Sequence, residues 1–180
     1  LEKKIPVLGI EPTKNTAAVA ISKGIETVTE FFGVAFAQKL AGSGRKADLL
    51  LGNNVLAHVP DINDFVGGMK VILKPTGVIT MEFPHLYQLV ANNQFDTVYH
   101  EHFSYLSFYT VQQVFAAAGL TLFDVEELPT HGGSLRIYGR HTEDTTHAVS
   151  PRVEAMLQKE KTAGMKDMSY YQSFQQAAEK

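Results

Sequence analysis

Short apolar segments of strand length alternate with segments of helical spacing through the first half of this sequence. Strands are predicted at 5–10, 25–32, 47–51 and 78–83, and helices at 13–23, 35–40 and 62–73. Strands and helices that alternate at this spacing are typical of a parallel sheet with helices on both faces. In such sheets ligands bind beyond the carboxyl ends of the strands, so a functional site is expected there.

The second half of the chain departs from this alternation. A helix is predicted at 108–118, with Ser107 or Thr110 as its cap. The segments 120–128 and 134–141 read as two strands, and the Gly-rich link between them indicates an antiparallel pair. From Pro151 onward the sequence is polar with sparse apolar residues, which predicts a helical tail that packs against something other than this core.

The composition excludes several classes of protein. With 180 residues, of which 44% are hydrophobic, the chain is long and apolar enough for one domain with a core. Its net charge is −3 and it has no basic cluster, which argues against nucleic-acid binding. No apolar run could span a bilayer, and residues 1–4 do not resemble a signal peptide. The absence of Cys removes disulfides and thiolate zinc sites, and a cytoplasmic protein is expected.

The most distinctive stretch for chemistry is FDTVYHEHFSYLS at 95–107, which includes Tyr99, Glu101 and His102. An imidazole exchanges protons near neutral pH, a carboxylate can orient it, and a phenol can donate a hydrogen bond. The alternative is a structural aromatic cluster whose histidines are hydrogen-bonded in a core. In a regular strand Tyr99 and His102 would face opposite sides, so an acid/base site requires a turn or an irregular loop here.

A zinc site is a further alternative for the same stretch. His100 and His102 flank Glu101, and His131 could join them. However, the sequence has no helical H-E-x-x-H and no clear third ligand at fixed spacing, so no metal site is predicted.

Several motifs in order along the chain resemble the sugar C-methyltransferase family. They are GIEP at 9–12, NNVLAHVPD at 53–61, EFPHL at 82–86, the 95–107 stretch and LPTHGGSLRIY at 128–138. Members of that family use S-adenosylmethionine (SAM) to methylate C3 of a nucleotide-linked 4-keto-deoxysugar. The resemblance spans about 5–138. It implies an α/β fold, the Rossmann-like class I SAM-methyltransferase fold, with a mostly parallel sheet and an antiparallel C-terminal strand pair.

The chain also departs from that family. The family opens its SAM domain with a strand and a Gly-rich loop, and the first strand here matches the family's second, so that strand and loop are expected to be missing. We expect a core truncated at its N-terminus at 1–150, and a helical tail at 151–180 leading to an absent C-terminal domain. Without the Gly-rich loop, weak SAM binding is expected. The gap left in the sheet should be closed directly or by pairing between chains as a homo-oligomer.

The resemblance also assigns catalytic roles. His102 is the expected base that removes the C3 proton of the sugar, and Tyr99 is expected to donate to the enolate or to position the substrate. Glu101 would orient His102 or hold a sugar hydroxyl, and His58 would be a further polar group of the active site.

Cofactor contacts are expected at the ends of three strands. Glu11 is placed to accept the ribose hydroxyls of SAM, or else it is a carboxylate favoured at a helix N-terminus. Glu30, Phe31 and Phe32 end the next strand and are expected to border the adenine, with one of the two phenylalanines in the core, the usual fate of that side chain. Asn53 and Asn54 should lie beside the methionine part of SAM, unless they only form a turn.

The sequence therefore predicts a SAM-dependent C-methyltransferase that acts on a small-molecule nucleotide sugar, with no nucleic-acid or membrane partner. The alternative is a non-catalytic binding or scaffold domain that retains the fold.

Overall fold

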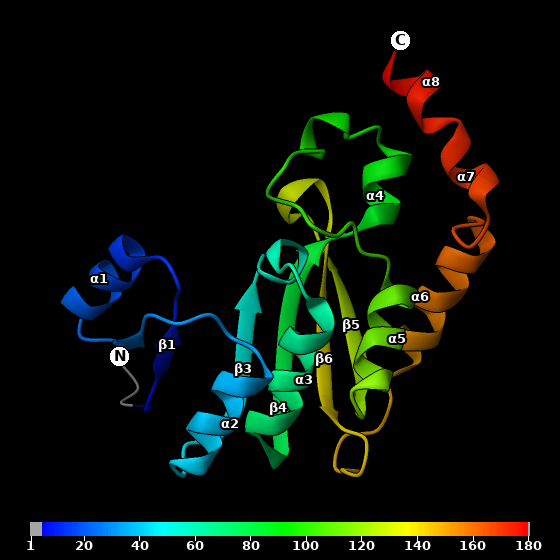
Figure 1. Ribbon diagram of the computed structural model, residues 1–180. Helices are drawn as coiled ribbons and strands as arrows, with labels where there is room; N and C mark the ends of the chain where they lie inside the picture. Colours follow the sequence, from blue (N-terminus) through cyan, green and yellow to red (C-terminus); the bar gives the residue numbers. More distant parts are fainter. Residues whose placement is uncertain (1–4, 180) are drawn as a thin grey trace.

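The computed structural model describes residues 5–179, and its strands form two separate sheets (Figure 1). The smaller sheet pairs β1 (Leu8–Ile10) with β2 (Glu26–Val28) in parallel. The larger sheet contains, in spatial order, β3 (Ala47–Asn53), β4 (Leu73–Pro84), β6 (Ser134–His141) and β5 (Leu120–Leu128). β3 and β4 are parallel, whereas β6 is antiparallel to both its neighbours. The predicted parallel strands and antiparallel pair are confirmed, with β1 and β2 shorter and β4 longer than expected.

The helices follow the predicted order with one addition. They are α1 (Lys14–Ser22), α2 (Val34–Gly42), α3 (Ile62–Ile72), α4 (Leu86–Ala91), α5 (Phe108–Ala117), α6 (Pro151–Thr162), α7 (Met168–Gln172) and α8 (Phe174–Ala178), with short 3-10 turns η1 (Leu56–His58), η2 (Phe95–Thr97) and η3 (Thr130–Gly132). The six-residue α4 was not predicted, because so short a helix shows little periodicity. Ser107 is the cap of α5, since its hydroxyl accepts from Thr110 N. Within residues 5–179, no helix is long and apolar enough to cross a bilayer.

The main hydrophobic core lies on one face of the four-stranded sheet. Leu50, Ile79 and Ile137 share that face by strand register and pack against α3, α5 and α6. On the opposite face, Leu49 and Leu51 of β3 are 56% and 66% exposed. The prediction of helices on both faces is therefore wrong at β3 for the part of the chain described.

The two sheets are joined through α2 rather than by strand pairing. Leu8 and Ile10 of β1 pack on a small core formed by Leu40 of α2 and Ile72 of α3. No described strand pairs with the free edge of β3, so the predicted direct closure of the gap is not seen. An unpaired strand edge presents free backbone donors and acceptors.

Helices α2 and α3 approach each other closely at Gly68. A Cβ at this position would lie 2.8 Å from the backbone carbon of Gly33, so only glycine fits without a shift. Beside it, the Asp64 carboxylate accepts from Val34 N at 3.1 Å and satisfies an amide at the start of α2. This contact fixes the segment that follows β2 against the rest of the domain.

The helical tail does not leave the core. Val153 and Met156 of α6 are buried in the main core against β5 and α5. The expectation that this tail packs elsewhere is wrong for α6, because two apolar residues three positions apart form a sufficient contact stripe on an otherwise polar helix. The later helices α7 and α8 contain no buried residue.

Candidate active site

The segment from α4 to α5 crosses the carboxyl ends of β3 and β4 as an irregular loop (Figure 1). His102 N donates to Tyr99 O at 3.2 Å, which makes a turn of residues 99–102. Phe103 N and Ser104 N then both donate to Ala57 O, at 2.9 and 3.2 Å, and dock the loop on η1. The predicted turn is confirmed, and the strand that would have separated Tyr99 from His102 is absent here.

Tyr99 and His102 form a direct contact in this loop. The Tyr99 hydroxyl lies 3.1 Å from Nε2 of His102, and the ring centroids are 4.3 Å apart. The other ring nitrogen, Nδ1, lies 3.2 Å from the Thr97 carbonyl oxygen, which can only accept. Nδ1 of a neutral His102 therefore carries the proton, and Nε2 presents a basic lone pair to the Tyr99 hydroxyl.

His58 enters the same cluster from η1. Its Nδ1 donates to the backbone oxygen of Glu101 at 2.9 Å, and its ring centroid is 4.7 Å from that of His102. The second ring nitrogen of His58 is thus left as a further basic atom. The carboxylate of Glu101 has no hydrogen-bond partner among residues 5–179, so its backbone, and not its side chain, holds this cluster together in the structure.

The surroundings of His102 lower its pKa and so favour the neutral imidazole. Burial is the largest cause that lowers its pKa, and the charge of nearby His58 lowers it further. The Thr97 carbonyl and the Glu101 charge act in the opposite direction without reversing the shift. A histidine whose pKa lies below its ordinary value is unprotonated, and available as a base, throughout the neutral pH range.

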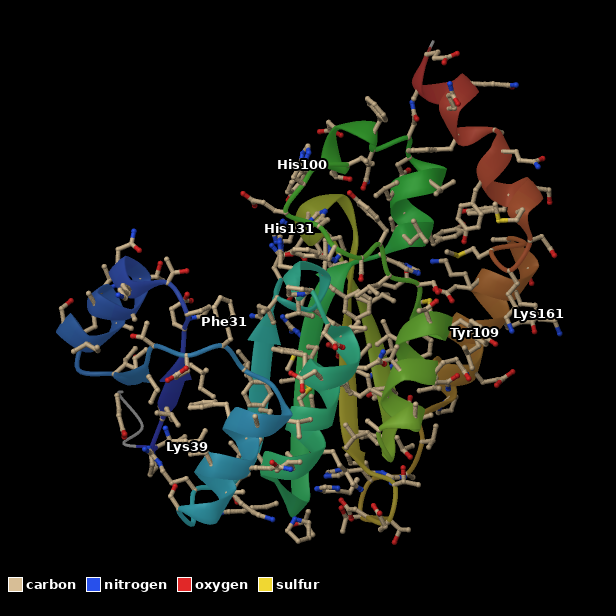
Figure 2. All side chains as sticks on the ribbon, in the orientation of Figure 1. Phe31, Lys39, His100, Tyr109, His131 and Lys161 are labelled. Carbon is tan, nitrogen blue, oxygen red and sulfur yellow. The ribbon has the colours of Figure 1, made fainter. Side chains whose placement is uncertain are left out.

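The turn between β5 and β6 borders the cluster. His131 has a left-handed backbone, φ 52°, and Gly132 and Gly133 also have positive φ. Thr130 fixes this turn, since its hydroxyl donates to the buried Glu82 carboxylate at 2.7 Å. The Thr130 hydrogen bond, followed by that from Arg136, keeps the pKa of Glu82 below its ordinary value. Figure 2 shows His131 and His100 at this end of the sheet, and the charge of His131 also lowers the pKa of His102.

Asn54 has a buried polar atom that a ligand could meet. Its side-chain oxygen is buried without a hydrogen-bond partner among residues 5–179. The residue has φ 54° and follows β3, where its backbone N–H donates to Glu82 O at 2.8 Å. An unpartnered buried acceptor is costly, so a donor from a ligand would fit here. Asn53 beside it is exposed at the end of β3.

The remaining predicted cofactor residues lie on the β1–β2 side. Glu11 follows β1 and one of its carboxylate oxygens accepts from Thr13 N at 2.8 Å, while the other oxygen has no partner among residues 5–179. Helix α1 has no acidic residue in its first turn and no side-chain cap hydrogen bond. Phe32 packs edge-on against Phe65, with centroids 5.3 Å apart, as part of the core. Its neighbour Phe31 is 79% exposed (Figure 2). The structure thus leaves Phe31, rather than Phe32, with a free aromatic face.

Two features of the site were missed by sequence reasoning. The Thr97 carbonyl sets the tautomer of His102, and Thr130 ties the 129–133 turn to Glu82. A backbone carbonyl leaves no signal in the sequence, because every residue has one. Thr130 belongs to a quoted motif, but its role depends on the pairing of β4 with β6.

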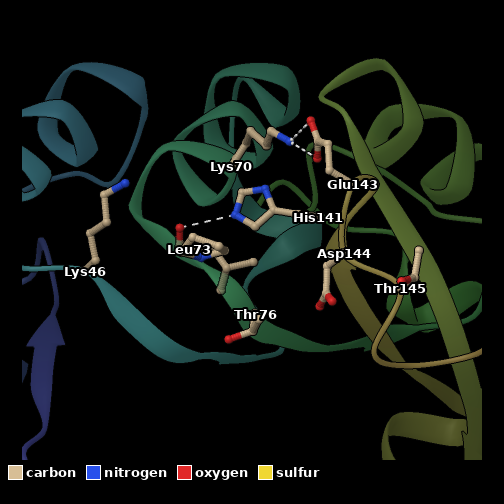
Figure 3. A pocket seen from close by; sticks show the side chains of 9 residues that line it. Lys46, Lys70, Leu73, Thr76, His141, Glu143, Asp144 and Thr145 are labelled. Carbon is tan, nitrogen blue, oxygen red and sulfur yellow. Dashed lines mark hydrogen bonds and ion pairs between the residues drawn. The ribbon is translucent and has the colours of Figure 1, made fainter.

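A cavity of about 460 Å³ lies at the opposite end of the sheet, near the start of β4 and the end of β6 (Figure 3). Lys70 is paired with Glu143 at 2.8 Å, and Nε2 of His141 donates to Leu73 O at 3.2 Å. These polar groups already have hydrogen-bond or ion-pair partners within the chain. Ligands in such sheets bind at the other end, beyond the carboxyl ends of the strands, so this cavity is not the candidate site. Over residues 5–179, no group of three or more His, Cys, Asp or Glu side chains could hold a metal ion.

Comparison with known proteins finds a relative among the methyltransferases. C-methyltransferase NovU of Streptomyces niveus is 36% identical over 168 residues, covering 93% of this chain and 40% of that protein. The chain therefore spans well under half the length of this relative. Residues 129–180 match the family described as C-methyltransferase C-terminal domain.

Solved structures share the fold at low sequence identity. The PH0226 protein of Pyrococcus horikoshii OT3 is 15% identical with a TM-score of 0.61, covering 78% of this chain and 73% of that one. A SAM-dependent methyltransferase of Thermotoga maritima is 18% identical with a TM-score of 0.58, covering 76% and 73% of the two chains. The fold is that of class I SAM-methyltransferases. Residues 2–125 match the family described as methyltransferase domain. Because this match covers more than half of the 180 residues, the chain belongs to the methyltransferase domain family.

Proposed function

We propose that this chain carries the catalytic site of a SAM-dependent C-methyltransferase that deprotonates C3 of a nucleotide-linked 4-keto-deoxysugar and methylates the resulting enolate. The observation that carries the proposal is the contact between the Tyr99 hydroxyl and Nε2 of His102, with Nδ1 held by Thr97 O. An imidazole and a phenol side by side in one loop support the proposed roles of base and hydrogen-bond donor. The similarity to C-methyltransferase NovU supports carbon as the acceptor atom.

The two groups match the two demands of the reaction. The carbonyl at C4 acidifies the C3–H bond, and Nε2 of His102 takes that proton. Negative charge then develops on the C4 oxygen, which needs a donor. Because C3 and the C4 oxygen are close together on the sugar, a base and a phenol 3.1 Å apart can serve both at once. The Tyr99 hydroxyl would exchange its hydrogen bond to His102 for one to the enolate oxygen.

The chain offers residues for the cofactor at the same end of the sheet. When bound, SAM supplies the electrophilic methyl group. The unpartnered Oδ1 of Asn54 can accept from the amino group of its methionine part, with Asn53 beside it. The carboxylate oxygen of Glu11 that Thr13 does not use can accept a ribose hydroxyl. Phe32, or its exposed neighbour Phe31, can border the adenine.

The neighbouring side chains have supporting roles. His58 holds the loop through Glu101 O and lowers the pKa of His102. The exposed carboxylate of Glu101 is free to accept a sugar hydroxyl. Both roles leave Nε2 of His102 as the atom that moves the proton.

Proton exchange at C3 tests the proposal without requiring methyl transfer. The protein is incubated in D₂O with a nucleotide-linked 4-keto-deoxysugar and S-adenosylhomocysteine, and loss of the C3 proton signal is followed by NMR. We expect exchange well above the protein-free rate. Exchange at the protein-free rate, with the sugar shown to bind, would favour the alternative of a non-catalytic domain.

We also propose that the free edge of β3 pairs with a second chain. β3 is an edge strand of the four-stranded sheet, and it exposes Leu49 and Leu51. Edges with exposed apolar side chains are sites of association unless charged residues protect them. The proposed partner is a second copy of this chain, which would pair with the free edge of β3 to form a homo-oligomer.

A further inference from the structure

A buried carboxylate on α6 contacts both ends of the segment that carries the candidate active-site loop. Glu160 is 3% exposed, and its Oε1 lies 2.7 Å from Nε2 of His85, which is 1% exposed. The same Oε1 accepts from Phe108 N at 2.6 Å, and Oε2 accepts from Tyr109 N at 2.9 Å. His85 stands immediately before α4, and Phe108 begins α5.

The two ends that Glu160 joins are already adjacent. Leu86 N donates to Leu106 O at 3.0 Å, and His85 forms an isolated parallel bridge with Leu106. Residues 86–107 therefore form a closed loop whose base is the contact of 85–86 with 106–109. Tyr99, Glu101 and His102 lie within this closed loop, between its two anchored ends.

Neighbours of Glu160 strengthen the same contact. The Lys159 ammonium lies 5.0 Å from the centroid of Tyr87 in α4, and that of Lys166 lies 3.6 Å from the centroid of Tyr109 in α5. Thus one stretch of the C-terminal segment holds the helix on each side of the loop (Figure 2, where Tyr109 and Lys161 mark the region). Cation–π contacts of this kind add modestly to a hydrogen-bonded anchor.

A buried carboxylate is tolerated only where donors surround it. Glu160 has three N–H donors and sits at the N-terminus of α5, where the helix dipole also favours an anion. His85 must present an N–H at Nε2 to the carboxylate, and its Nδ1 is buried without a partner among residues 5–179. The side chain of His85 is therefore committed to Glu160 and is unlike the exposed His100.

We infer that Glu160 and His85 are positioning residues that fix the loop bearing Tyr99 and His102, so that α6 controls the geometry of the site. The inference rests on the proposed function for the role of that loop. Loop-closing contacts act on every residue between the two ends, since they remove conformational freedom from the whole segment. Neither residue touches the reacting atoms.

The test compares His85→Phe with His85→Gln by hydrogen exchange of backbone amides. Phe fills the buried space without a donor, whereas the Gln amide keeps an N–H that can reach the carboxylate. We expect exchange in 86–107 to quicken about tenfold or more in His85→Phe, and less than threefold in His85→Gln, because a charge-assisted hydrogen bond is lost only in the first. Amides of β4 and β6 serve as an internal reference for global opening.

Two further measurements keep the inference testable. Glu160→Gln, in which the amide nitrogen cannot accept from Tyr109 N, should quicken the same segment, whereas Glu154→Gln on the exposed side of α6 should not. If either variant fails to fold, hydrogen exchange is measured on the unsubstituted protein instead. The backbone amides of Leu86, Phe108 and Tyr109 should then exchange together, and more slowly than those of residues 97–102. In a methylation assay His85→Phe should lower kcat about tenfold, with KM for SAM within about twofold.

Unchanged exchange in 86–107 in His85→Phe would overturn the inference. So would an equal increase across β4, β6 and the loop, which would show a merely structural pair. These results do not depend on turnover, so absence of methylation by the parent protein would count against the proposed function and leave the exchange result standing.

Discussion

The hydroxyl of Tyr99 lies 3.1 Å from Nε2 of His102, across a single turn of the loop above the sheet. The contact depends on Thr97 O, which accepts a hydrogen bond from Nδ1–H and leaves Nε2 as an acceptor. The Tyr99 hydroxyl can donate a hydrogen bond to an oxyanion that forms beside the base. This relationship leads to expected outcomes for each residue.

Replacement of His102 by Gln should remove the base. General base catalysis contributes about 10²- to 10⁴-fold to a rate, so methyl transfer and C3 proton exchange should both fall by about that factor. His100→Gln is the matched control, since His100 is an exposed neighbour in the same loop, and its rates should stay within about threefold of the parent. NMR of the C3 signal measures exchange. Equal losses in the two variants would contradict the assignment.

Replacement of Tyr99 by Phe should remove the oxyanion donor but keep the ring that packs on His102. Loss of one such donor costs about 10²- to 10³-fold in kcat. Substrate KM should change much less, because the donor acts mainly on the developing charge. Steady-state kinetics separates the two parameters. A rise in KM at constant kcat would instead show that Tyr99 only binds substrate.

The pH dependence should report the lowered pKa of His102. Its neutral form is the active one, so the acid limb of kcat/KM should lie below pH ~6.5, the ordinary pKa of histidine. His58→Gln keeps an N–H for Glu101 O but removes the imidazole whose charge lowers the pKa of His102. The pKa of His102 should then rise, and the acid limb of kcat/KM should move to higher pH. An acid limb that stayed in place or moved down would refute the coupling.

Replacement of Asn54 by Gly should weaken SAM binding with little loss of stability. Gly tolerates the positive φ of this position but supplies no acceptor for the cofactor amino group. We expect the Kd for SAM to rise about tenfold, the value of one well-formed hydrogen bond to a charged group. Asn93→Gly is the control, because Asn93 has φ 51° on the exposed surface. Titration calorimetry measures the Kd for SAM of both variants. Equal Kd values would remove Asn54 from the cofactor site.

Charged substitutions on β3 should test association through its edge. Lysine at Leu49 and Leu51 places two positive charges on exposed positions, so folding should be little affected. We expect the weight-average mass in sedimentation equilibrium to fall toward that of the monomer. Lys161→Glu on α6, which is also exposed and lies on a helix that packs on β5 at the other edge of the sheet, should leave the mass unchanged. A monomeric parent protein would refute pairing.

Several parts of the site could be predicted because they depend on local sequence. Tyr99 and His102 are three positions apart, and one turn brings them together. Ser107 caps α5 through a hydrogen bond to a residue three positions away. Other parts could not be predicted, since His58 meets Glu101 O across 43 residues and Thr130 meets Glu82 across 48. Pairings of that range follow from strand order, which local patterns do not specify.

The sequence by itself determined the alternation of strands and helices, the antiparallel C-terminal pair and the short stretch that holds the acid/base groups. These follow from periodicity and residue chemistry within a few positions of each other. Only the tertiary structure decided that Phe32 is partly buried against the core and Phe31 exposed, that α6 packs on the core, and that Glu160 meets His85 across 75 residues. The physical reason is that burial and long-range hydrogen bonds depend on which surfaces the folded chain brings together, and many chain arrangements satisfy the same local pattern.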